Sequence, residues 1–417
     1  MLPLVNVATE HILPGQLLAG ARFELPRDDV AACYARVLLS ALGAEVQLGA
    51  QARGLSPTQA WRDSGLAAVT GPSGEAGLDC PAPLASCADG AMLAIEAVQA
   101  RTLPWQGRRL LGMRRCSHPL RAGGRVSANG SCRLLATADG DIAINLARPE
   151  DWQLLPAWLE CEGVDSWSAV TARVATRRRA ELLERARWMG LAVAPSASPS
   201  ARPWLHATQL TAGPAKASAR FRVIDLSALW AGPLCSFLLA GSGAEVLRVE
   251  HPQRPDGARL GPATFFDSLN AGKATCALDL ATREGRDTLL ALITEADVVI
   301  EGSRPRALRQ LGVDAEALVQ QHSGLCWLSI TGYGRGAPEA DWVAFGDDAA
   351  VAAGLSELMR ARYGEALFCG DALADPLTGM HAALAVLAAR RAGCGGLFSV
   401  PLRDVTAHAI VAGLNVL

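Results

Sequence analysis

Three aspartates stand at positions that could serve chemistry. Asp375 lies in the segment ADPLTGMHAALAVL, and Asp347 and Asp348 are neighbours in AFGDDAAVAAG. The adjacent pair could bind or orient a substrate, but two charged neighbours are also typical of a solvated loop, which is the interpretation we favour. Asp375 precedes Pro376, and Asp before Pro is a common helix start, so capping a helix is a second role open to it.

A comparison within the sequence singles out Asp375 further. Residues 83–98 (PLASCADGAMLAIEAV) align with residues 372–387 (ALADPLTGMHAALAVL) at an offset of 289. Asp375 then corresponds to Ser86. A carboxylate kept in only one of two copies is either a functional group or an ordinary surface acid, and this comparison leaves both open.

A second match has a different offset. LLSALGAEV (38–46) is similar to LLAGSGAEV (238–246) at an offset of 200, so the first half lacks about 89 residues, the difference between the two offsets. We interpret the first half as a partial, decayed copy of the second.

The composition restricts the classes of function. The chain of 417 residues can form two or three domains, and 50% hydrophobic with 19% charged residues is typical of a folded protein. Lys and Arg (39) nearly balance Asp and Glu (41), so no overall basic field would attract nucleic acid or anionic lipid. The 11 cysteines form no CxxC pair. This pattern argues against a disulfide framework or a metal site and favours reduced thiols in a cytoplasmic protein.

No segment predicts export or membrane insertion. The N-terminus lacks a basic region followed by a long apolar core. The long uncharged run between Asp225 and Glu245 contains Gly and Pro, which suits a strand, a turn and a helix better than a membrane span.

The second half alternates strand-like and helix-like segments. Strands are expected in RVIDL (222–226), AEVLRVE (244–250), ADVVIEG (296–302) and LCWLSITGYG (325–334), with helices in AGPLCSFLLAGSG (231–243) and at 283–295. Such alternation, with Gly and Pro at the strand ends, indicates a parallel sheet with crossover helices. We therefore predict an α/β fold with an open Rossmann-like sheet, a ligand crevice at the C-terminal strand ends, and a smaller α+β domain.

Two further segments complete the organisation of the chain. Residues 195–220 are rich in Pro, Ala and Ser without helical or strand period, so we interpret them as a linker. Before them, residues 167–189 predict one amphipathic helix with a solvated basic face, and Gly190 is its expected C-cap.

The second half resembles the family III CoA-transferases, which include formyl-CoA and carnitine CoA-transferases and α-methylacyl-CoA racemase. Five blocks in order carry the resemblance over about residues 220–413: VIDLSALWAGPLCSFLLAGSGAEVLRVEHP, SLNAGKATCALDL, ADVVIEGSRPRALRQLGVD, LSITGYGRGAP and ADPLTGMHAALAVLAARRAG.

The first half resembles other parts of the same family. Residues 127–155 look like its strand-rich small domain, and ELLERARWMGLAVAP looks like its C-terminal return segment. The two halves together could rebuild one family unit in permuted order. On this interpretation the chain consists of four parts: a partial repeat of the large domain (1–110), a segment similar to the small domain and the return segment (111–194), the linker (195–220) and a CoA-binding α/β domain (221–417).

The resemblance implies a role for Asp375. In the family the aspartate of the AD-x-x-x-G block is the nucleophile, which attacks an acyl-CoA thioester to give a mixed anhydride and then an aspartyl-CoA thioester. Gly379 would permit close packing near that carboxylate.

The resemblance also implies a CoA site. CoA carries phosphates, so its site should combine cations with backbone donors at strand ends. The segments that line this site in the family contain Arg248, Arg259, Asn270, Lys273 and Arg304, each of which could instead be a solvated surface residue.

Two departures from the family pattern bear on the reaction. Trp230 occupies a position before the AGP turn that is often polar. The racemase branch uses a histidine after the G-Y-G block, whereas the segment DWVAFGDDAAVAAG has none. His381, six residues past Asp375, is interpreted as a core or helix-surface histidine.

The leading prediction is an acyl-CoA:carboxylate CoA-transferase that binds coenzyme A as acyl-CoA, without a metal. The alternatives are a CoA-thioester isomerase or racemase on the same scaffold, and a non-catalytic subunit that binds CoA thioesters. A carboxylic acid acceptor and a second copy of the chain, in a homodimer, are the expected partners, and nucleic acid and membranes are not.

Overall fold

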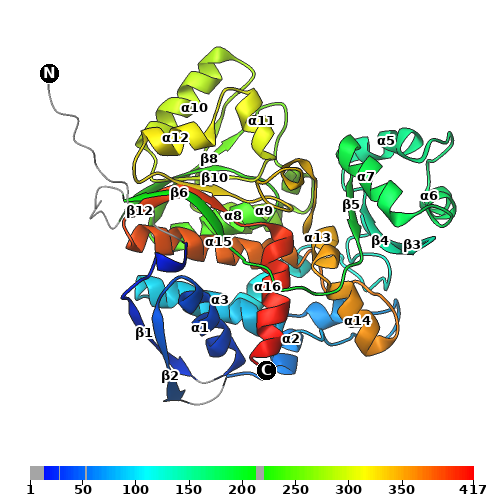
Figure 1. Ribbon diagram of the computed structural model, residues 1–417, viewed down its shortest axis with the longest axis horizontal. Coiled ribbons are helices and arrows are strands. Elements are labelled where there is room, and N and C mark those ends of the chain that lie inside the picture. Colours follow the sequence, from blue (N-terminus) through cyan, green and yellow to red (C-terminus); the bar gives the residue numbers. More distant parts are fainter. Residues whose placement is uncertain (1–13, 28, 52–53, 213–219) are drawn as a thin grey trace, which may run out of the picture.

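A seven-stranded sheet forms the centre of the molecule (Figure 1). The computed structural model describes residues 14–27, 29–51, 54–212 and 220–417. The strand order is β6 (His206–Ala212), β12 (Cys394–Ser399), β11 (Cys326–Ser329), β10 (Val298–Glu301), β7 (Phe221–Leu226), β8 (Ala244–Glu250) and β9 (Ala274–Ala277). All neighbouring strands are parallel except β6, which pairs antiparallel with β12.

The central strands are apolar on both faces, which explains why the sheet is covered on both sides. Every residue of β10, β11 and β12 is buried. Successive side chains point to opposite faces. Ile224, Val299 and Trp327 therefore pack with one group of helices, and Val223 and Ile300 pack with the other. Near-continuous apolar strands of this kind are typical of a parallel sheet between helical layers.

The helices form two layers around this sheet (Figure 1). One layer contains α10 (Arg283–Glu295), α11 (Pro305–Gln310) and α12 (Ala315–Gln321), and the other contains α8 (Ala231–Gly241) and α15 (Ala374–Arg391). The remaining elements of this half are η4 (Gly257–Leu260), α9 (Ala263–Asn270), η5 (Glu339–Asp341), α13 (Gly346–Ala352), α14 (Leu355–Tyr363) and α16 (Leu402–Asn415). The predicted α/β fold is confirmed, and the expected strands and helices of this half lie where the sequence placed them.

The first half begins with a strand-helix-strand unit on the outer side of α15 (Figure 1). Its elements are β1 (Arg22–Arg27), α1 (Val30–Ala41) and β2 (Glu45–Gln51), and the later helix α3 (Leu84–Gln99) packs against α1. The parallel pair β1–β2 has the same register as β7–β8: Arg22 lies opposite Glu45, and Arg222 lies opposite Glu245. Shorter elements surround it, namely η1 (Pro14–Gln16), α2 (Pro57–Asp63), η2 (Leu66–Val69), α4 (Gly107–Leu111) and η3 (Met113–Cys116).

Two glycines set the packing of the central helices. A Cβ at Gly90 of α3 would lie 2.5 Å from the carbonyl oxygen of Ala31 in α1, and a Cβ at Gly379 of α15 would lie 2.6 Å from that of Ala231 in α8. Each glycine therefore allows its helix to approach the backbone of the neighbouring helix. Because α3 also packs on α15, these contacts build a continuous core across both halves.

A smaller α+β domain stands beside the main sheet (Figure 1). The antiparallel strands β3 (Cys132–Thr137), β4 (Gly140–Asn145) and β5 (Ala192–Pro195) pack against α5 (Pro149–Leu159), α6 (Trp167–Val174) and α7 (Arg179–Met189). These helices and strands share a hydrophobic core of their own.

The structure corrects the single helix expected at 167–189. Two helices, α6 and α7, cover this range, and Arg178 between them is extended. The carbonyl of Arg177 accepts a hydrogen bond from the Ala138 N–H in the β3–β4 turn, so the chain turns toward the sheet at this point. Gly190 does end α7, in the left-handed conformation with φ 73°.

The segment expected to be a linker also differs from expectation. Within 195–220, residues His206–Ala212 form β6 at the edge of the main sheet. An edge strand pairs with only one other strand and is less buried than a central strand. Most residues of β6 are accordingly at least partly exposed, and its sequence, HATQLTA, lacks a continuous apolar run. None of the helices in the described ranges is long and apolar enough to cross a membrane.

The two glycine contacts predict matched effects on stability. Gly90→Ala and Gly379→Ala should each lower the free energy of unfolding by about 1–3 kcal/mol, because the new methyl group would clash with a backbone carbonyl. Gly336→Ala is the control, since no atom lies within 4 Å of a Cβ there. Denaturant unfolding measures all three, and wild-type stability for both helix variants would contradict this packing.

Candidate active site

A cavity of about 350 Å³ lies at the carboxyl ends of β7, β10 and β11. This is the edge at which an open α/β sheet binds its ligand. Backbone and small side chains after each strand form much of the wall, and the first turn of α8 closes one side. The lining residues are Arg148, Ser227, Ala228, Leu229, Ala231, Gly232, Gly302, Ser303, Arg304, Ala307, Ile330, Thr331, Gly332, Ala340, Trp342, Val343, Ala344, Phe345, Asp375 and Leu402.

Asp375 faces this cavity from the first turn of α15. The helix begins at Ala374 with Leu373 as its N-cap, so the expectation that Asp375 caps the helix is wrong. Its side chain makes no hydrogen bond or ion pair within the part of the chain that the structure describes. The carboxylate lies against Gly346, where any side chain would collide with its Oδ2 atom.

The surroundings of Asp375 hold its carboxyl group partly protonated. Burial is the main cause that raises the pKa of Asp375, to about 7, and Asp347, Asp348 and Asp371 raise it further. Arg114 acts in the opposite direction and lowers the pKa. A carboxyl group with a pKa near neutrality is common among groups that take part in catalysis.

Arg114 joins the two halves of the chain at this point. Its guanidinium forms a bidentate ion pair with Asp371, with Nε 2.7 Å from Oδ2, and the side chain of Asp371 is only 1% exposed. Asp371 lies in the turn just before α15. This pair therefore ties η3 of the first half to the turn that positions Asp375.

Asp347 and Asp348 are buried, which corrects the expectation of a solvated loop. They open α13, and Asp347 Oδ1 accepts a hydrogen bond from the Ala372 N–H at 2.8 Å. Asp348 Oδ1 accepts one from the Asn145 amide of the small domain at 2.9 Å. Burial raises the pKa of both carboxyl groups. The pair thus supports the turn before Asp375 and the contact with the small domain.

Two arginines provide positive charge in the cavity. Arg304 precedes α11 and has no hydrogen bond or ion pair from its guanidinium to any described residue. Arg148 comes from the small domain, is paired with Asp151, and donates from Nη2 to the carbonyl of Gly190 at 3.0 Å. Burial, and then the like charges of Arg306 and Arg148, lower the pKa of Arg304. The site therefore contains unneutralised positive charge beside Asp375.

Of the residues expected to bind CoA, only Arg304 lines this cavity. Arg248, Asn270 and Lys273 form a buried network instead: Arg248 donates to Glu250 (2.7 Å), Asn270 (3.1 Å) and Asp256 (2.5 Å), and Lys273 Nζ donates to the carbonyl of Pro233 (2.8 Å). Buried charges need partners, and these side chains find them within the protein. They hold β8 and α9 against α8 rather than line the crevice.

Arg259 and Gly379 also lie outside the cavity. Arg259 donates to both carboxylate oxygens of Glu250 at 3.1 and 3.0 Å. Gly379 lies beneath Ala231 and packs α15 against α8. Conversely, no sequence motif predicts a place at this site for Arg114 or Arg148, which lie far from Asp375 in the chain.

His381 and Trp230 are part of the core. The Nδ1–H of His381 donates to the carbonyl of Leu377 at 2.7 Å, and Nε2 accepts from the Tyr34 hydroxyl at 2.9 Å. Burial lowers the pKa of His381 to about 3, so it stays neutral. Trp230 is buried against Phe265. Neither residue lines the cavity that contains Asp375.

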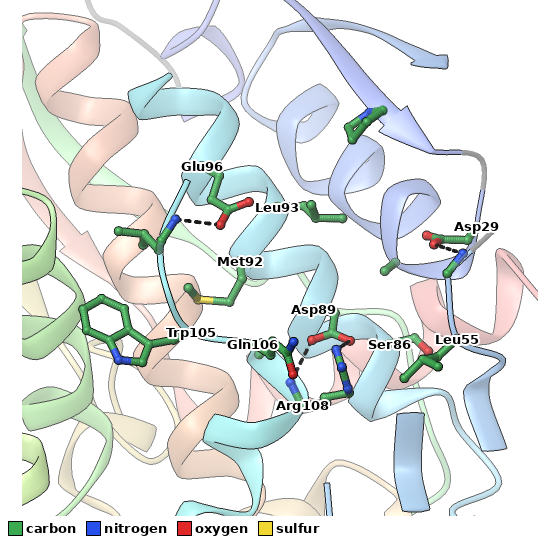
Figure 2. A pocket seen from close by; sticks show the side chains of 15 residues that line it. Asp29, Leu55, Ser86, Asp89, Met92, Leu93, Glu96, Trp105, Gln106 and Arg108 are labelled. Carbon is green, nitrogen blue, oxygen red and sulfur yellow. Dashed lines mark hydrogen bonds and ion pairs between the residues drawn. The ribbon is translucent and has the colours of Figure 1, made fainter. Parts of the chain in front are cut away.

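A second cavity, of about 540 Å³, lies in the first half and contains Ser86 (Figure 2). Ser86 is the residue that aligns with Asp375. Three acids, Asp29, Asp89 and Glu96, line this cavity, and Asp89 is paired with Arg108 at 2.9 Å. Among the described lining residues acids predominate and Arg108 is paired, which does not suit a phosphate-bearing ligand. The described residues contain no group of three or more His, Cys, Asp or Glu arranged for a metal ion.

The raised pKa of Asp375 predicts a pH-dependent effect on stability. Its carboxyl group ionises near pH 7 in the folded protein and near pH 4 in the unfolded chain, so its burial destabilises the fold increasingly as pH rises from 4 to 7. Asp375→Asn removes this cost. The stability gain over wild type should therefore grow by about 1–2 kcal/mol between pH 5.5 and 8.5, after allowance for solvent in the cavity.

Denaturant unfolding at the two pH values measures this difference. Asp165→Asn, at an exposed position of the small domain, is the control and should show no such growth. An Asp375→Asn gain that is equal at both pH values would show that the carboxylate is not destabilised by its surroundings.

The comparisons with known proteins concern mainly the second half. Residues 219–409 match the family model of CoA-transferase family III. The succinate–glutarate CoA-transferase of Agrobacterium fabrum is 33% identical over 211 residues, 46% of this chain and 52% of that protein. The formyl-CoA:oxalate CoA-transferase of Escherichia coli is 29% identical over 194 residues, 44% of this chain and 47% of that protein.

A similar solved structure is that of Rv3272 from Mycobacterium tuberculosis, with 32% identity and a TM-score of 0.41, covering 45% of this chain and 53% of that one. The chain spans about half the length of the curated relatives it matches. The matched segment contains every strand of the main sheet except β6, Asp375, and all lining residues of its cavity except Arg148. Residues 219–409 are therefore similar to CoA-transferase family III over somewhat less than half of the chain.

Proposed function

We propose that this protein is a CoA-transferase that moves CoA from an acyl-CoA to a carboxylic acid, with Asp375 as the nucleophile. The main support is the position of Asp375, a carboxylate without a partner among the described residues, at the strand-end cavity of a family III domain. Relatives of the matched segment bear names of CoA-transferases that act on different acids, so the acyl donor and acceptor stay open.

The first step uses the ionised form of Asp375. A carboxylate oxygen attacks the thioester carbonyl, an acyl–oxygen bond forms, and the C–S bond breaks to release CoA thiolate, leaving a mixed anhydride. The thiolate then attacks the aspartyl carbonyl. The original acyl group leaves as a free carboxylate, and an aspartyl-CoA thioester remains.

The second acid reverses this sequence. Its carboxylate attacks the aspartyl-CoA thioester and releases CoA thiolate, which attacks the acceptor carbonyl of the new anhydride. The new acyl-CoA leaves and Asp375 is regenerated as a carboxylate. Because the complete reaction consumes one carboxylate and releases another, no net proton is consumed.

Other residues of the cavity fit this chemistry. Each carbonyl attack develops an oxyanion, and the first turn of α8, which includes Ala231 and Gly232, carries backbone N–H groups that a helix leaves unpaired. Arg304 and Arg148 provide positive charge for carboxylate or phosphate groups. Arg114 favours the ionised form of Asp375.

We also propose that both halves descend from one family unit and complement each other. The shared register of β1–β2 and β7–β8 and the matching glycine contacts support the duplication. The first half contributes the small domain, with Arg148 and Asn145, to the site of the second half. We propose that the units of the chain are residues 1–110, 111–194 and 221–417. We also propose that the protein forms a homodimer.

Intact-protein mass spectrometry tests the role of Asp375. After incubation with short, branched and aromatic acyl-CoAs, the wild type should gain the mass of one covalently bound CoA from at least one donor. Asp375→Asn should gain none, because an amide is a poor nucleophile. Asp165→Asn is again the matched control and should behave as wild type.

The outcome also separates the alternatives. A CoA adduct that persists in Asp375→Asn would contradict the assigned nucleophile. Conversion of a donor without any adduct would favour an isomerase, and tight binding of every donor without adduct or turnover would favour a non-catalytic subunit.

A further inference from the structure

A third cavity lies where β12 pairs with the edge strand β6 of the main sheet (Figure 1). It measures about 490 Å³, and of the described residues none lines both this cavity and the one that contains Asp375. Three of its lining residues are His206, Ser399 and Asp404. These residue types can supply a general base, a nucleophile and a carboxylate that orients the base.

A row of polar side chains crosses the sheet at this cavity. Glu301, Ser329, Ser399 and His206 lie opposite one another on the adjacent strands β10, β11, β12 and β6. Residues that face each other across neighbouring strands project from the same side of a sheet. Ser399 and His206 form a directly opposed antiparallel pair, which places their Cβ atoms about 4.5–5.5 Å apart. The serine and the imidazole are therefore neighbours in the cavity.

Ser399 has a buried hydroxyl without a structural role. The residue is 6% exposed, and its Oγ atom has no hydrogen-bond partner among the described residues. A buried polar group without a partner is unusual, and a catalytic role is one of the reasons why such a group persists. The neighbouring Ser329, by contrast, donates to Glu301 Oε1 at 2.5 Å. Ser399 Oγ is thus available to a molecule in the cavity.

His206 is oriented by a carboxylate. Its Nε2 atom lies 3.3 Å from Asp404 Oδ2, so Nε2 carries the proton and Nδ1 is left as an acceptor. Arg403 donates to the other oxygen of Asp404 at 2.8 Å. Burial acts to raise the pKa of Asp404, but the hydrogen bonds from His206 and Arg403 lower the pKa overall, so the carboxylate is ionised. An ionised carboxylate selects one tautomer of the imidazole and stabilises its protonated form.

Arg335 places a hydrogen-bond donor beside Ser399. Its Nη1 atom donates to Ser329 Oγ at 2.9 Å, and Ser329 is the residue opposite Ser399 on β11. Nη2 donates to Glu316 at 2.8 Å, so the guanidinium is fixed. The Nε–H group is buried and has no hydrogen-bond partner among the described residues. A fixed, positively charged donor beside a nucleophile can stabilise the oxyanion that forms when a carbonyl is attacked.

We propose that this cavity is a second catalytic site, which hydrolyses a small carboxylic ester with Ser399 as the nucleophile and His206 as the general base. Asp404 is a positioning residue for His206. The volume is within the range of small-molecule sites, and Leu397 provides an apolar contact for the acyl group. The activity uses neither Asp375 nor CoA, so it does not depend on the transferase reaction.

One side-chain rotation completes the arrangement. Ser399 Oγ and the imidazole of His206 do not form a hydrogen bond in the structure. Rotation about the Cα–Cβ bond of Ser399 moves Oγ between its staggered positions, and no existing hydrogen bond opposes that rotation. Hydrogen bonds between catalytic groups often form only when a substrate is bound.

The reaction proceeds in two steps. Ser399 Oγ attacks the ester carbonyl while its proton passes to His206 Nδ1, and the C–O bond breaks as the alcohol leaves with that proton. Water then attacks the acyl-serine and gives a proton to Nδ1. The carboxylic acid is released as Ser399 Oγ takes this proton back. One ester and one water thus become one acid and one alcohol.

Labelling with a fluorophosphonate tests the nucleophile in the full-length protein. Ser399 Oγ should attack phosphorus and displace fluoride, so mass spectrometry should find one phosphonyl group, on the peptide that contains Ser399. Ser399→Ala should gain none, and it should stay folded because loss of a hydroxyl without a partner breaks no hydrogen bond. His206→Gln, at a side chain that is 48% exposed, should label about 10²–10⁴-fold more slowly, the range for a general base.

Two variants are matched controls. Ser268→Ala removes an exposed hydroxyl from α9, and His251→Gln removes an imidazole that pairs with Asp279 at 3.1 Å outside this cavity. Both should label at the rate of wild type. Release of nitrophenolate from 4-nitrophenyl acetate is a second readout, and the rates of all variants should follow the same order.

Each result bears on a separate part of this proposal. Equal labelling of wild type and Ser399→Ala, or a label on another residue, would overturn Ser399 as the nucleophile. A label on Ser399 that forms equally fast in His206→Gln would overturn His206 as the base. No label on wild type, with nitrophenolate released no faster than by Ser399→Ala, would overturn the second catalytic site.

Discussion

The buried ion pair between Arg114 and Asp371 is the interaction on which the site depends. Four carboxyl groups, those of Asp347, Asp348, Asp371 and Asp375, gather at the starts of α13 and α15. Burial raises the pKa of Asp347, Asp348 and Asp375, and the neighbouring carboxylates add to that effect. One guanidinium, from the first half, offsets part of it by pairing with Asp371. Removal of that charge would leave a buried carboxylate unpaired, which is among the most destabilising changes a core can suffer. Asp375 of one half thus depends on a cation of the other.

The two halves use the same packing with different chemical results. In both, a glycine lets a long helix approach the helix of a strand-helix-strand unit. In the second half the long helix presents Asp375 to a cavity that contains Arg304, which has no ion pair with any described residue, whereas in the first half the aligned residue is Ser86 and three acids line the cavity. The helix packing of the two halves can therefore agree where the polar residues of their cavities differ, because helix contacts depend on size and shape and ligand chemistry depends on particular functional groups.

The small domain contributes residues to the cavity at the strand ends of the main sheet. An open α/β sheet offers a crevice at its strand ends but leaves it open to water. Arg148 and Asn145 reach this edge from the small domain, and α7 places Arg187 and Trp188 beside it. Exclusion of water strengthens the interactions of charged groups with a ligand. The position of the small domain against α13 is therefore part of the site itself.

The sequence alone determined the α/β fold, the strands and helices of the second half, and Asp375 as the residue to test, because these depend on local apolar patterns and on short motifs. The sequence alone could not show which arginine and lysine side chains line the cavity that contains Asp375. Arg248 and Lys273 pair with Asp225, Asp256 and Glu250 in the folded chain, and Asn270 Oδ1 accepts a hydrogen bond from each of these two cations. Arg114 and Arg148 reach the site from more than 200 residues away. Which charges are neutralised and which remain free depends on partners brought together by folding, so only the tertiary structure decided it.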